Sequence, residues 1–396
     1  METMTNTMLD FSEIPVIDNH CHPLDPKKAV LSSELLAREF YHGLGDLPLT
    51  DTSARLRGIS QNLGHHIQNL GVVQTLVRQL SMVLGCEADL ETVSAERNRR
   101  ASEDFALYCK MLYNNARIKG TVLDSDLPSS DPGLALIPSR LMRLFQMGPP
   151  LRAFLKTSTS YQELLQRYRE ALDQAVKKDG YVGVKAHLAE EVGFGAGYVT
   201  EAEAGASFAL AKAGDPMAYR KLYTAVFTAT MLQCQELRIP VHVHSGTTGG
   251  LWNGPVSDAD PFLLVPLLRR PELIQTRVIL LHGAYPWIQH AAAVAHALPH
   301  VWVDMGWTTP WISLRIVECY RDLVGMAPLS KLMIGSGGHG IPEIAWLSAK
   351  TAKIALGKTL GESVELGLMG RKQAENAGRM ILYENATRLY HIKENG

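Results

Sequence analysis

The chain has 396 residues, of which 46% are hydrophobic and 20% charged, a composition ordinary for a soluble globular enzyme with a large core. Its 39 basic and 40 acidic side chains give a formal net charge of −1 without a long run of one sign, so neither nucleic acid nor an anionic membrane surface is indicated as a partner. The first residues do not resemble a secretory signal, no apolar run is long enough to span a bilayer, and five scattered cysteines fit reduced thiols, so we expect a cytoplasmic protein.

Short apolar runs rich in β-branched residues alternate with longer helical patterns along the chain. The runs that predict strands are 14–18, 118–124, 181–187, 239–244, 277–282, 301–304 and 331–335. Helical patterns cover 217–237 and 343–356. Because strands that alternate with helices are typical of βαβ units, the pattern predicts an α/β fold, a (β/α)8 TIM barrel. The remaining strand falls near 137–145, where the pattern is weak.

The segment 25–117 is too long for an ordinary loop between a strand and a helix. Apolar residues recur with helical spacing in 31–43, 75–85 and 95–116. We interpret the segment as a helical insertion after the first strand, lying over the barrel mouth, within a single domain that covers 1–396.

Four histidines follow or end predicted strands: His20 and His22 follow the first, His244 ends the fifth and His282 ends the sixth. In a parallel barrel the active-site groups lie at the carboxyl ends of the strands, and residues two apart on a strand point to the same side. A single histidine at a strand end is more often a hydrogen-bonding residue than a ligand. Four histidines at equivalent positions favour a metal site, because neutral imidazole is the commonest ligand for zinc and related divalent metals.

Other polar residues near the same strand ends are candidates for contacts with a substrate. His242 shares a strand face with His244, and a buried hydrogen-bonding role for it is about equally expected. His187 ends the fourth predicted strand, and Thr247 belongs to the polar loop 246–250 after the fifth. Ordinary roles in helices or loops are expected for the remaining histidines considered, which are His65, His66, His290, His296 and His300.

Lys185 lies at the inner end of the apolar run 181–187. A lysine in this position must lose hydration or find a partner. It would bind a substrate carboxylate, or react with carbon dioxide to give a carbamate that bridges two metals. The alternative is a long side chain that reaches the surface. Its neighbours His187, Glu190 and Glu191 favour a role in a site.

Six segments in order resemble the amidohydrolase superfamily, specifically the amidohydrolase-2 group, which includes the N-terminal domain of FluG-type proteins. They are IDNHCHPL (17–24), GVKAHLA (183–189), PVHVHSG (240–246), LLHGAYPW (280–287), VWVDMG (301–306) and IGSGGHGIPE (334–343). The resemblance covers most of the chain outside the helical insertion.

The resemblance implies a barrel that holds a divalent metal, zinc in the first place and manganese as an alternative, as one or two ions. Its ligands would be His20, His22, His244 and His282, while Lys185 falls at a position that is a carbamylated bridge in some members. The implied activity is hydrolysis of an amide-like C–N bond of a small molecule by metal-activated water.

One position departs from the family pattern. Relatives read Gly-Ser/Thr-Asp at the eighth strand, where the aspartate binds metal and takes a proton from water, whereas this chain has Gly337 in its place. His339 is a candidate replacement base. Alternatively, the chain is an inactivated variant, or a barrel without the usual hydrolysis. If the aspartate is simply missing, restoring Asp at position 337 should raise hydrolysis.

Two further functions stay open beside hydrolysis. The first is a non-hydrolytic barrel enzyme, either a decarboxylase or an isomerase. The second is a catalytically inactive barrel that acts as a metal-binding scaffold. In each case the expected partner is a small molecule, and because exposed barrel helices often pair, a homo-oligomer is compatible with the pattern.

Overall fold

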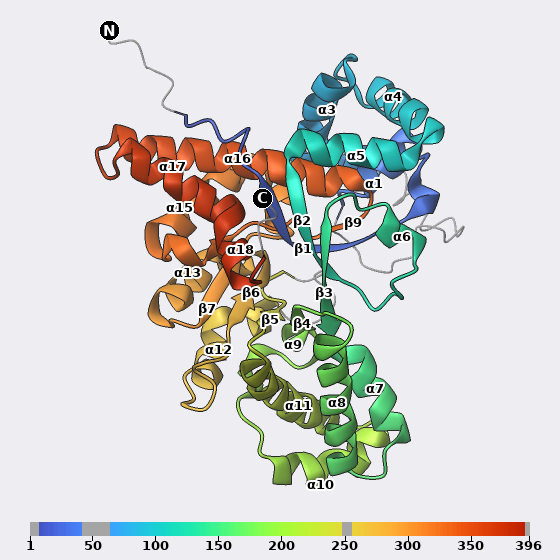
Figure 1. Ribbon diagram of the computed structural model, residues 1–396, viewed down its shortest axis with the longest axis vertical. Coiled ribbons are helices and arrows are strands. Elements are labelled where there is room, and N and C mark those ends of the chain that lie inside the picture. Colours follow the sequence, from blue (N-terminus) through green and yellow to red (C-terminus); the bar gives the residue numbers. More distant parts are fainter. Residues whose placement is uncertain (1–7, 42–63, 248–255, 393–396) are drawn as a thin grey trace.

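The computed structural model describes residues 8–41, 64–247 and 256–392. Its centre is one parallel sheet whose strands follow the order β8-β7-β6-β5-β4-β3-β2-β1-β9. The strands are β1 (Val16–Leu24), β2 (Ile118–Asp124), β3 (Arg140–Gln146), β4 (Gly183–Ala186), β5 (Val241–Val243), β6 (Val278–Leu280), β7 (Val301–Asp304), β8 (Leu332–Met333) and β9 (Gly338–Gly340). The sheet curls and helices surround it, which confirms the predicted α/β TIM-barrel-like fold (Figure 1).

The segment after β8 joins the two ends of the sheet. The backbone N–H of Asn19 donates to the carbonyl of Ile334 over 2.9 Å, and that of Ser336 donates to the carbonyl of His20 over 3.1 Å. The Ser336 hydroxyl also donates to the buried carboxylate of Asp18 over 2.6 Å. These contacts hold the end of the eighth predicted strand beside the histidines of β1.

Most strand predictions agree with the structure, and the first requires a correction. The ranges 118–124 and 301–304 coincide with β2 and β7, and the weak pattern at 137–145 corresponds to β3. Strand β1 does not end before His20 but continues through His22 to Leu24, because β2 and β9 pair with this part of it. Both histidines therefore lie on a strand that pairs with a neighbouring strand on each side.

The barrel strands are apolar because both of their faces are covered. Val241, Val243, Ile279 and Val303 are completely buried. Lys185 in β4 is as deeply buried as these residues, so polar groups in this interior require partners.

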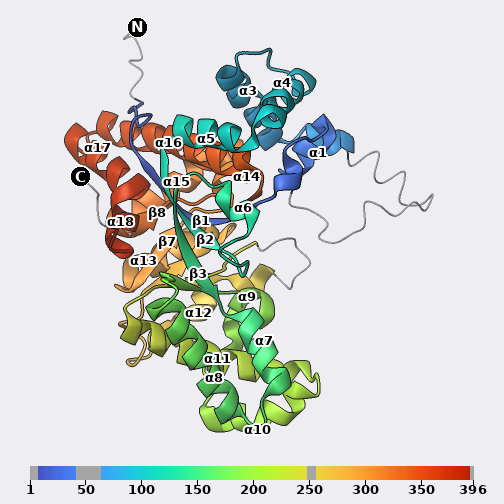
Figure 2. The ribbon, with the colours of Figure 1, turned by 45° about the vertical axis from the view of Figure 1, so that its right-hand side comes forward.

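Helices form the outer layer, and some extend well beyond it. The predicted helices 217–237 and 343–356 are confirmed as α11 (Pro216–Leu237) and α16 (Pro342–Glu365). The other helices after β2 are α6 (Pro132–Ala135), α7 (Gly148–Thr157), α8 (Tyr161–Lys177), α9 (Leu188–Glu191), α10 (Glu201–Lys212), α12 (Pro261–Leu268), α13 (Ile288–Ala297), α14 (Thr308–Trp311), α15 (Ile316–Met326), α17 (Arg371–Arg379) and α18 (Asn385–Leu389). Figure 2 shows that α7, α8, α10 and α11 form an arm that extends away from the sheet.

The expected helical insertion between β1 and β2 is present. It contains α1 (Ser33–Arg38), α3 (Gly71–Leu84), α4 (Leu90–Glu103) and α5 (Phe105–Ala116), while residues 42 and 43 of the first predicted helix lie outside the described residues. Figure 1 and Figure 2 both show α3, α4 and α5 on the side of the barrel where α16 runs. No described helix of the chain is both long and apolar enough to cross a membrane.

A buried ion pair anchors the insertion to α16. The guanidinium of Arg97 in α4 lies 2.8 Å from the carboxylate of Glu343, which also accepts a hydrogen bond from the hydroxyl of Tyr108 in α5. The side chains of Arg97 and Glu343 are fully buried. Arg97 also donates to the backbone carbonyls of Lys28 and Ala29.

Candidate metal centre

A cavity of about 510 Å³ opens at the carboxyl ends of the strands. Its lining consists of His20, His22, Pro23, Lys185, His187, His244, Thr247, His282, Trp307, Gly337 and His339. Every predicted metal or catalytic residue contributes to it. Within the described part of the chain, the lining includes no residue of the helical insertion, which was expected to cover the barrel mouth.

The histidine rings form a continuous row along the cavity. The ring centroids of His22 and His20 lie 4.9 Å apart, and those of His20 and His282 lie 5.1 Å apart. The row continues from His282 to His244 over 4.4 Å and from His244 to His187 over 5.7 Å. The barrel therefore brings together two histidines of β1 and the histidines that follow β4, β5 and β6, as the strand-end positions predict.

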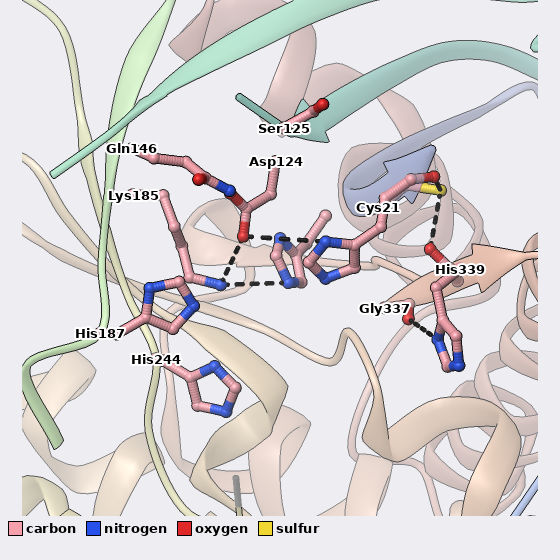
Figure 3. Close-up of polar contacts among 12 residues, drawn as sticks. Cys21, Asp124, Ser125, Gln146, Lys185, His187, His244, Gly337 and His339 are labelled. Atoms are coloured by element: carbon pink, nitrogen blue, oxygen red, sulfur yellow. Dashed lines mark hydrogen bonds and ion pairs between the residues drawn. The ribbon is translucent and has the colours of Figure 1, made fainter. Parts of the chain in front are cut away.

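Asp124, at the end of β2, is a site residue that the sequence interpretation missed. One carboxylate oxygen of Asp124 and one ring nitrogen each of His20 and His22 all lie within 4.8 Å of one another, a spacing that one metal ion can bridge. Gln146 donates to the other carboxylate oxygen over 2.7 Å (Figure 3). The available signal was an acidic residue that ends the predicted strand 118–124.

Lys185 is fully buried, so its side chain does not reach the surface. Its ammonium nitrogen lies 3.0 Å from the carboxylate oxygen Oδ2 of Asp124, which is itself fully buried, and 3.4 Å from Nε2 of His20 (Figure 3). The ammonium and the carboxylate compensate each other's charge in the interior, where either alone would be costly.

Burial keeps His22 and His187 in the cavity neutral. Burial lowers the pKa of His22 to about 4 and that of His187 to about 3, and the nearby Lys185 ammonium also lowers both values. The pKa of the Asp124 carboxyl lies below its usual range although burial opposes this, because Lys185 and His22 lie beside it. Neutral imidazoles and an ionised carboxylate are the protonation states that bind a divalent cation.

Several buried nitrogen atoms in the cavity lack a hydrogen bond. Among the described residues, Nδ1 of His20 and both ring nitrogens of His244 are shielded from solvent and make none. A buried polar atom without a partner costs about 1–3 kcal/mol. Coordination of a cation would use these lone pairs, so the residues present fit a metal centre.

A second group of possible ligands lies at the other end of the histidine row. It consists of His187, Glu190 and His244, with one ligand atom of each within 4.8 Å of the others. The Glu190 carboxylate lies 3.8 Å from Nε2 of His187 and 3.9 Å from Nδ1 of His244. Burial raises the pKa of Glu190 to about 7, although the Lys185 ammonium opposes the shift.

Three other predicted site residues have different surroundings. His242 is fully buried, its Nε2 lies 2.8 Å from the hydroxyl of Tyr390, and it does not line the cavity, which favours the buried hydrogen-bonding alternative. Thr247 lines the cavity and its hydroxyl donates to the carbonyl of Tyr285 over 2.9 Å. Residues 248–250 of the same loop lie outside the described residues. His339 lines the cavity, and its ring stacks on the ring of Trp311 with the two ring centroids 6.1 Å apart.

The backbone at Gly337 leaves no room for a side chain. Its φ is +59°, in the left-handed region, and a Cβ atom there would lie 2.9 Å from both the nitrogen and the Cα of Trp307. An aspartate would therefore require the backbone around Trp307 to move. This geometry disfavours the interpretation of Gly337 as an aspartate that has simply been replaced.

Asp304 is a second buried carboxylate that the sequence interpretation did not single out. It ends β7, accepts hydrogen bonds from the Asn19 amide and the Gly306 backbone, and burial raises its pKa to about 6. It does not line the cavity.

The chain is similar in sequence to a known protein family and to a known protein. Residues 165–392 match the family model of the amidohydrolases. Over 117 residues the chain is 32% identical to the protein fluG of Emericella nidulans, an alignment that covers 29% of this chain and 14% of that relative, so this chain spans only a small part of its length.

Two solved structures resemble the whole chain in fold. A Lactobacillus casei protein with the provisional description of a metal-dependent hydrolase has a TM-score of 0.80 at 20% identity, over 97% of this chain and 98% of that one. Glucuronate isomerase from Caulobacter crescentus has a TM-score of 0.68 at 15% identity, over 100% and 98%. The fold, the row of strand-end histidines and the match over more than half of the sequence agree, and the chain belongs to the amidohydrolase family.

Proposed function

We propose that this protein is a metal-dependent hydrolase that cleaves an amide-like C–N bond of a small molecule, with zinc or manganese as the metal. The observation that carries the proposal is that ligand atoms of His20 and His22, which line the cavity, and of Asp124, which is buried beside it, lie within 4.8 Å of one another. These three side chains would hold the cation, and His282 stands next to His20 in the row. When bound, such a cation supplies an activated water and polarises a carbonyl group.

His339 is the residue proposed to accept a proton from the attacking water. Its ring lines the cavity, and its Nδ1 lies 3.3 Å from the carbonyl of Gly337, an arrangement that assigns the proton to Nδ1 and the basic lone pair to Nε2. Burial lowers the pKa of His339 below its usual value, so the ring is neutral near pH 7. Asp124 is a poorer base, because its pKa is lowered and Lys185 pairs with it.

The lining of the cavity supports a proposal for the kind of substrate. It is small, and its lining carries a lysine and six histidines but, among the described residues, no carboxylate. A bound cation would add positive charge, so we propose a small substrate with an anionic or carbonyl oxygen near the bond that is cleaved. Lys185 already pairs with Asp124, which leaves it less suited than the cation to bind a substrate carboxylate.

Isomerisation of a sugar acid is the second candidate function. It is supported by the match to glucuronate isomerase over essentially both chains and by Gly337, which cannot supply the acid-base carboxylate expected of a hydrolase. The products separate the two functions. Release of ammonia or an amine from small amides indicates hydrolysis, and interconversion of hexuronates without such release indicates isomerisation.

Metal content tests the shared basis of both functions. Protein purified after growth with zinc or manganese should contain a transition metal, and His20→Ala with His22→Ala should remove the metal bound there. The matched control is His290→Ala, which changes a histidine that pairs with Asp260 outside the cavity. The proposal is abandoned if the wild-type protein holds no transition metal above trace level, or if the double variant retains the same amount.

A further inference from the structure

Helix α18 places a tyrosine inside the barrel from the end opposite the cavity. The helix is fixed at the amino ends of the strands: the side-chain amide of Asn385 donates to the carbonyl of Leu332, the first residue of β8, over 2.7 Å. Arg277, directly before β6, donates to the carbonyl of Leu389 over 3.3 Å. Tyr390 follows α18, is 9% exposed, and belongs to one hydrophobic cluster with side chains of β1, β2, β3, β6 and β8.

The hydroxyl of Tyr390 connects two strands that lie far apart in the sheet. It donates to the amide oxygen Oδ1 of Asn19 in β1 over 2.5 Å and lies 2.8 Å from Nε2 of His242 in β5. Because its single proton goes to Asn19, the hydroxyl oxygen accepts a hydrogen bond from Nε2 of His242. Strands β2, β3 and β4 stand between β1 and β5, so the hydroxyl reaches across the curled sheet.

The hydrogen bonds continue from Asn19 to the wall of the cavity. Nδ2 of Asn19 donates to Oδ2 of Asp304 over 3.0 Å, and Oδ1 of Asp304 accepts the backbone N–H of Gly306 over 2.6 Å. The next residue is Trp307, whose backbone N–H donates to Nδ1 of His282 over 3.0 Å. Trp307 and His282 both line the cavity, so the chain of hydrogen bonds links the barrel interior to the site.

The burial of these polar groups argues for a role beyond filling space. Asn19, His242 and Asp304 are completely buried, in a barrel interior where branched apolar side chains are the rule. A phenylalanine at position 390 would provide the same packing, whereas buried polar groups cost free energy unless they are hydrogen-bonded. A buried hydrogen-bonded network holds its members in one arrangement, and the tyrosine hydroxyl is the atom that joins two of them.

Both contacts of the hydroxyl lie next to histidines of the cavity. Asn19 directly precedes His20 on β1, and His242 stands two residues before His244. The row of rings runs from His20 to His282 over 5.1 Å and from His282 to His244 over 4.4 Å. The spacing within this part of the row therefore depends on how β1 and β5 are held relative to each other.

We propose that Tyr390 is a positioning residue of the candidate metal centre, whose hydroxyl holds β1 and β5 at the spacing that aligns His20, His282 and His244. The effect on cation binding rests on the metal-dependent function proposed above. Removal of an outer group that orients metal ligands weakens metal binding by about 10–100-fold. Tyr390 acts through Asn19 and His242, so we expect a loss of about tenfold, at the lower end of that range.

The test compares Tyr390→Phe with Tyr108→Phe, which also removes a buried tyrosine hydroxyl but one that donates to Glu343 outside the cavity. The first readout is the nitrogen-15 and proton resonances of the His20 and His244 rings in metal-free, full-length protein. The second is titration with Co²⁺, followed by visible absorption. We expect displaced ring resonances and an approximately tenfold higher Kd for Co²⁺ in Tyr390→Phe, and wild-type values in Tyr108→Phe. Circular dichroism and the melting temperature verify folding.

Each outcome decides for or against the positioning role. It is overturned if Tyr390→Phe matches the wild type in either readout, or if Tyr108→Phe shows the same changes. If the wild type binds no Co²⁺, the metal-dependent function fails, and the ring resonances alone decide the role of Tyr390. If Tyr390→Phe does not fold, His242→Leu, which removes the contact to β5 and leaves α18 unaltered, is measured instead and judged by the same criteria.

Discussion

A Cβ atom at position 337 would lie 2.9 Å from the backbone nitrogen of Trp307, closer than real Cβ contacts allow. Gly337 also has a left-handed φ of +59°, and its N–H donates to the carbonyl of His20 over 2.7 Å. Glycine thus lets the segment after β8 lie against β1 on one side and Trp307 on the other. The position at which the resemblance led us to expect an aspartate is therefore a packing position in this structure.

Gly337→Asp should therefore lower stability and should not raise hydrolysis. Overpacking costs about 1–3 kcal/mol, to which left-handed strain adds about 1–2 kcal/mol. Chemical unfolding and hydrolysis of small amides provide the measurements, with Gly337→Ala as the matched control for strain without the carboxylate. A stable Gly337→Asp protein with higher hydrolysis would restore the view that an aspartate is merely missing.

Lys185→Met should destabilise the metal-free protein by about 3–5 kcal/mol, because it leaves Asp124 buried without its positive partner. Added zinc should recover part of the loss, since the cation would take the place of the ammonium. Denaturant unfolding with and without zinc measures both effects. The control is Lys177→Met, which breaks an exposed pair with Asp173 and should change little. Equal losses in the two variants would contradict this role of Lys185.

The same ion pair predicts that Lys185 is not carbamylated. A carbamate would place a second negative charge beside the Asp124 carboxylate, where the structure has an ammonium at 3.0 Å. We expect no carbamate signal from Lys185 in carbon-13 spectra of metal-loaded protein incubated with labelled bicarbonate. A signal that disappears in Lys185→Met would show that the modification forms.

Arg97→Met should release the helical insertion from α16. It would leave the Glu343 carboxylate fully buried with Tyr108 but without its cation, at a cost of about 3–5 kcal/mol. Arg99→Met in the same helix removes exposed pairs and serves as the control. Unfolding free energies and hydrogen exchange in α4 and α5 should separate the two variants. If they behave alike, the buried pair does not anchor the insertion.

The metal-free protein should lose stability as the pH falls from about 6.5 toward 4. Burial lowers the folded-state pKa of His22 to about 4 and that of His242 to about 3, with His20, His187 and His244 shifted in the same direction. In this window the unfolded chain binds protons on these histidines and the folded chain does not, so stability is present above the unfolded pKa and is lost on acidification.

Three buried carboxyl groups have the opposite effect, because they make the folded protein less stable as the pH rises. Burial raises the pKa of Asp18 and Glu190 to about 7 and that of Asp304 to about 6, so their contribution is lost as the pH rises through those values. The histidines are more numerous, and we expect the net loss of stability on the acid side. Urea unfolding of chelator-treated protein across this range measures the dependence.

His242→Gln should make this dependence shallower, by at most about 1.4 kcal/mol per pH unit, because one fewer buried imidazole must take up a proton on unfolding. The exposed His296→Gln is the control and should leave the dependence unchanged. A dependence that is identical in His242→Gln and the wild type would show that His242 does not contribute.

Six segments of the sequence resembled the amidohydrolases and so indicated the family. The sequence by itself also determined most of the strands, the long helices and the histidine row. These features depend on local patterns: apolar runs mark buried strands, helical spacing marks amphipathic helices, and parallel strands necessarily bring their carboxyl ends together. Even Asp124 was visible as the last residue of a predicted strand, although its importance was not.

Only the tertiary structure decided which of these groups meet. The partner of Lys185 is Asp124, 61 positions earlier in the numbering, and the partner of His242 is Tyr390 near the end of the chain. The group of His187, Glu190 and His244 joins α9 to the end of β5. The packing of Gly337 depends on Trp307. Such relationships depend on side-chain distances between elements remote in the sequence, which the periodicity of a single chain does not specify.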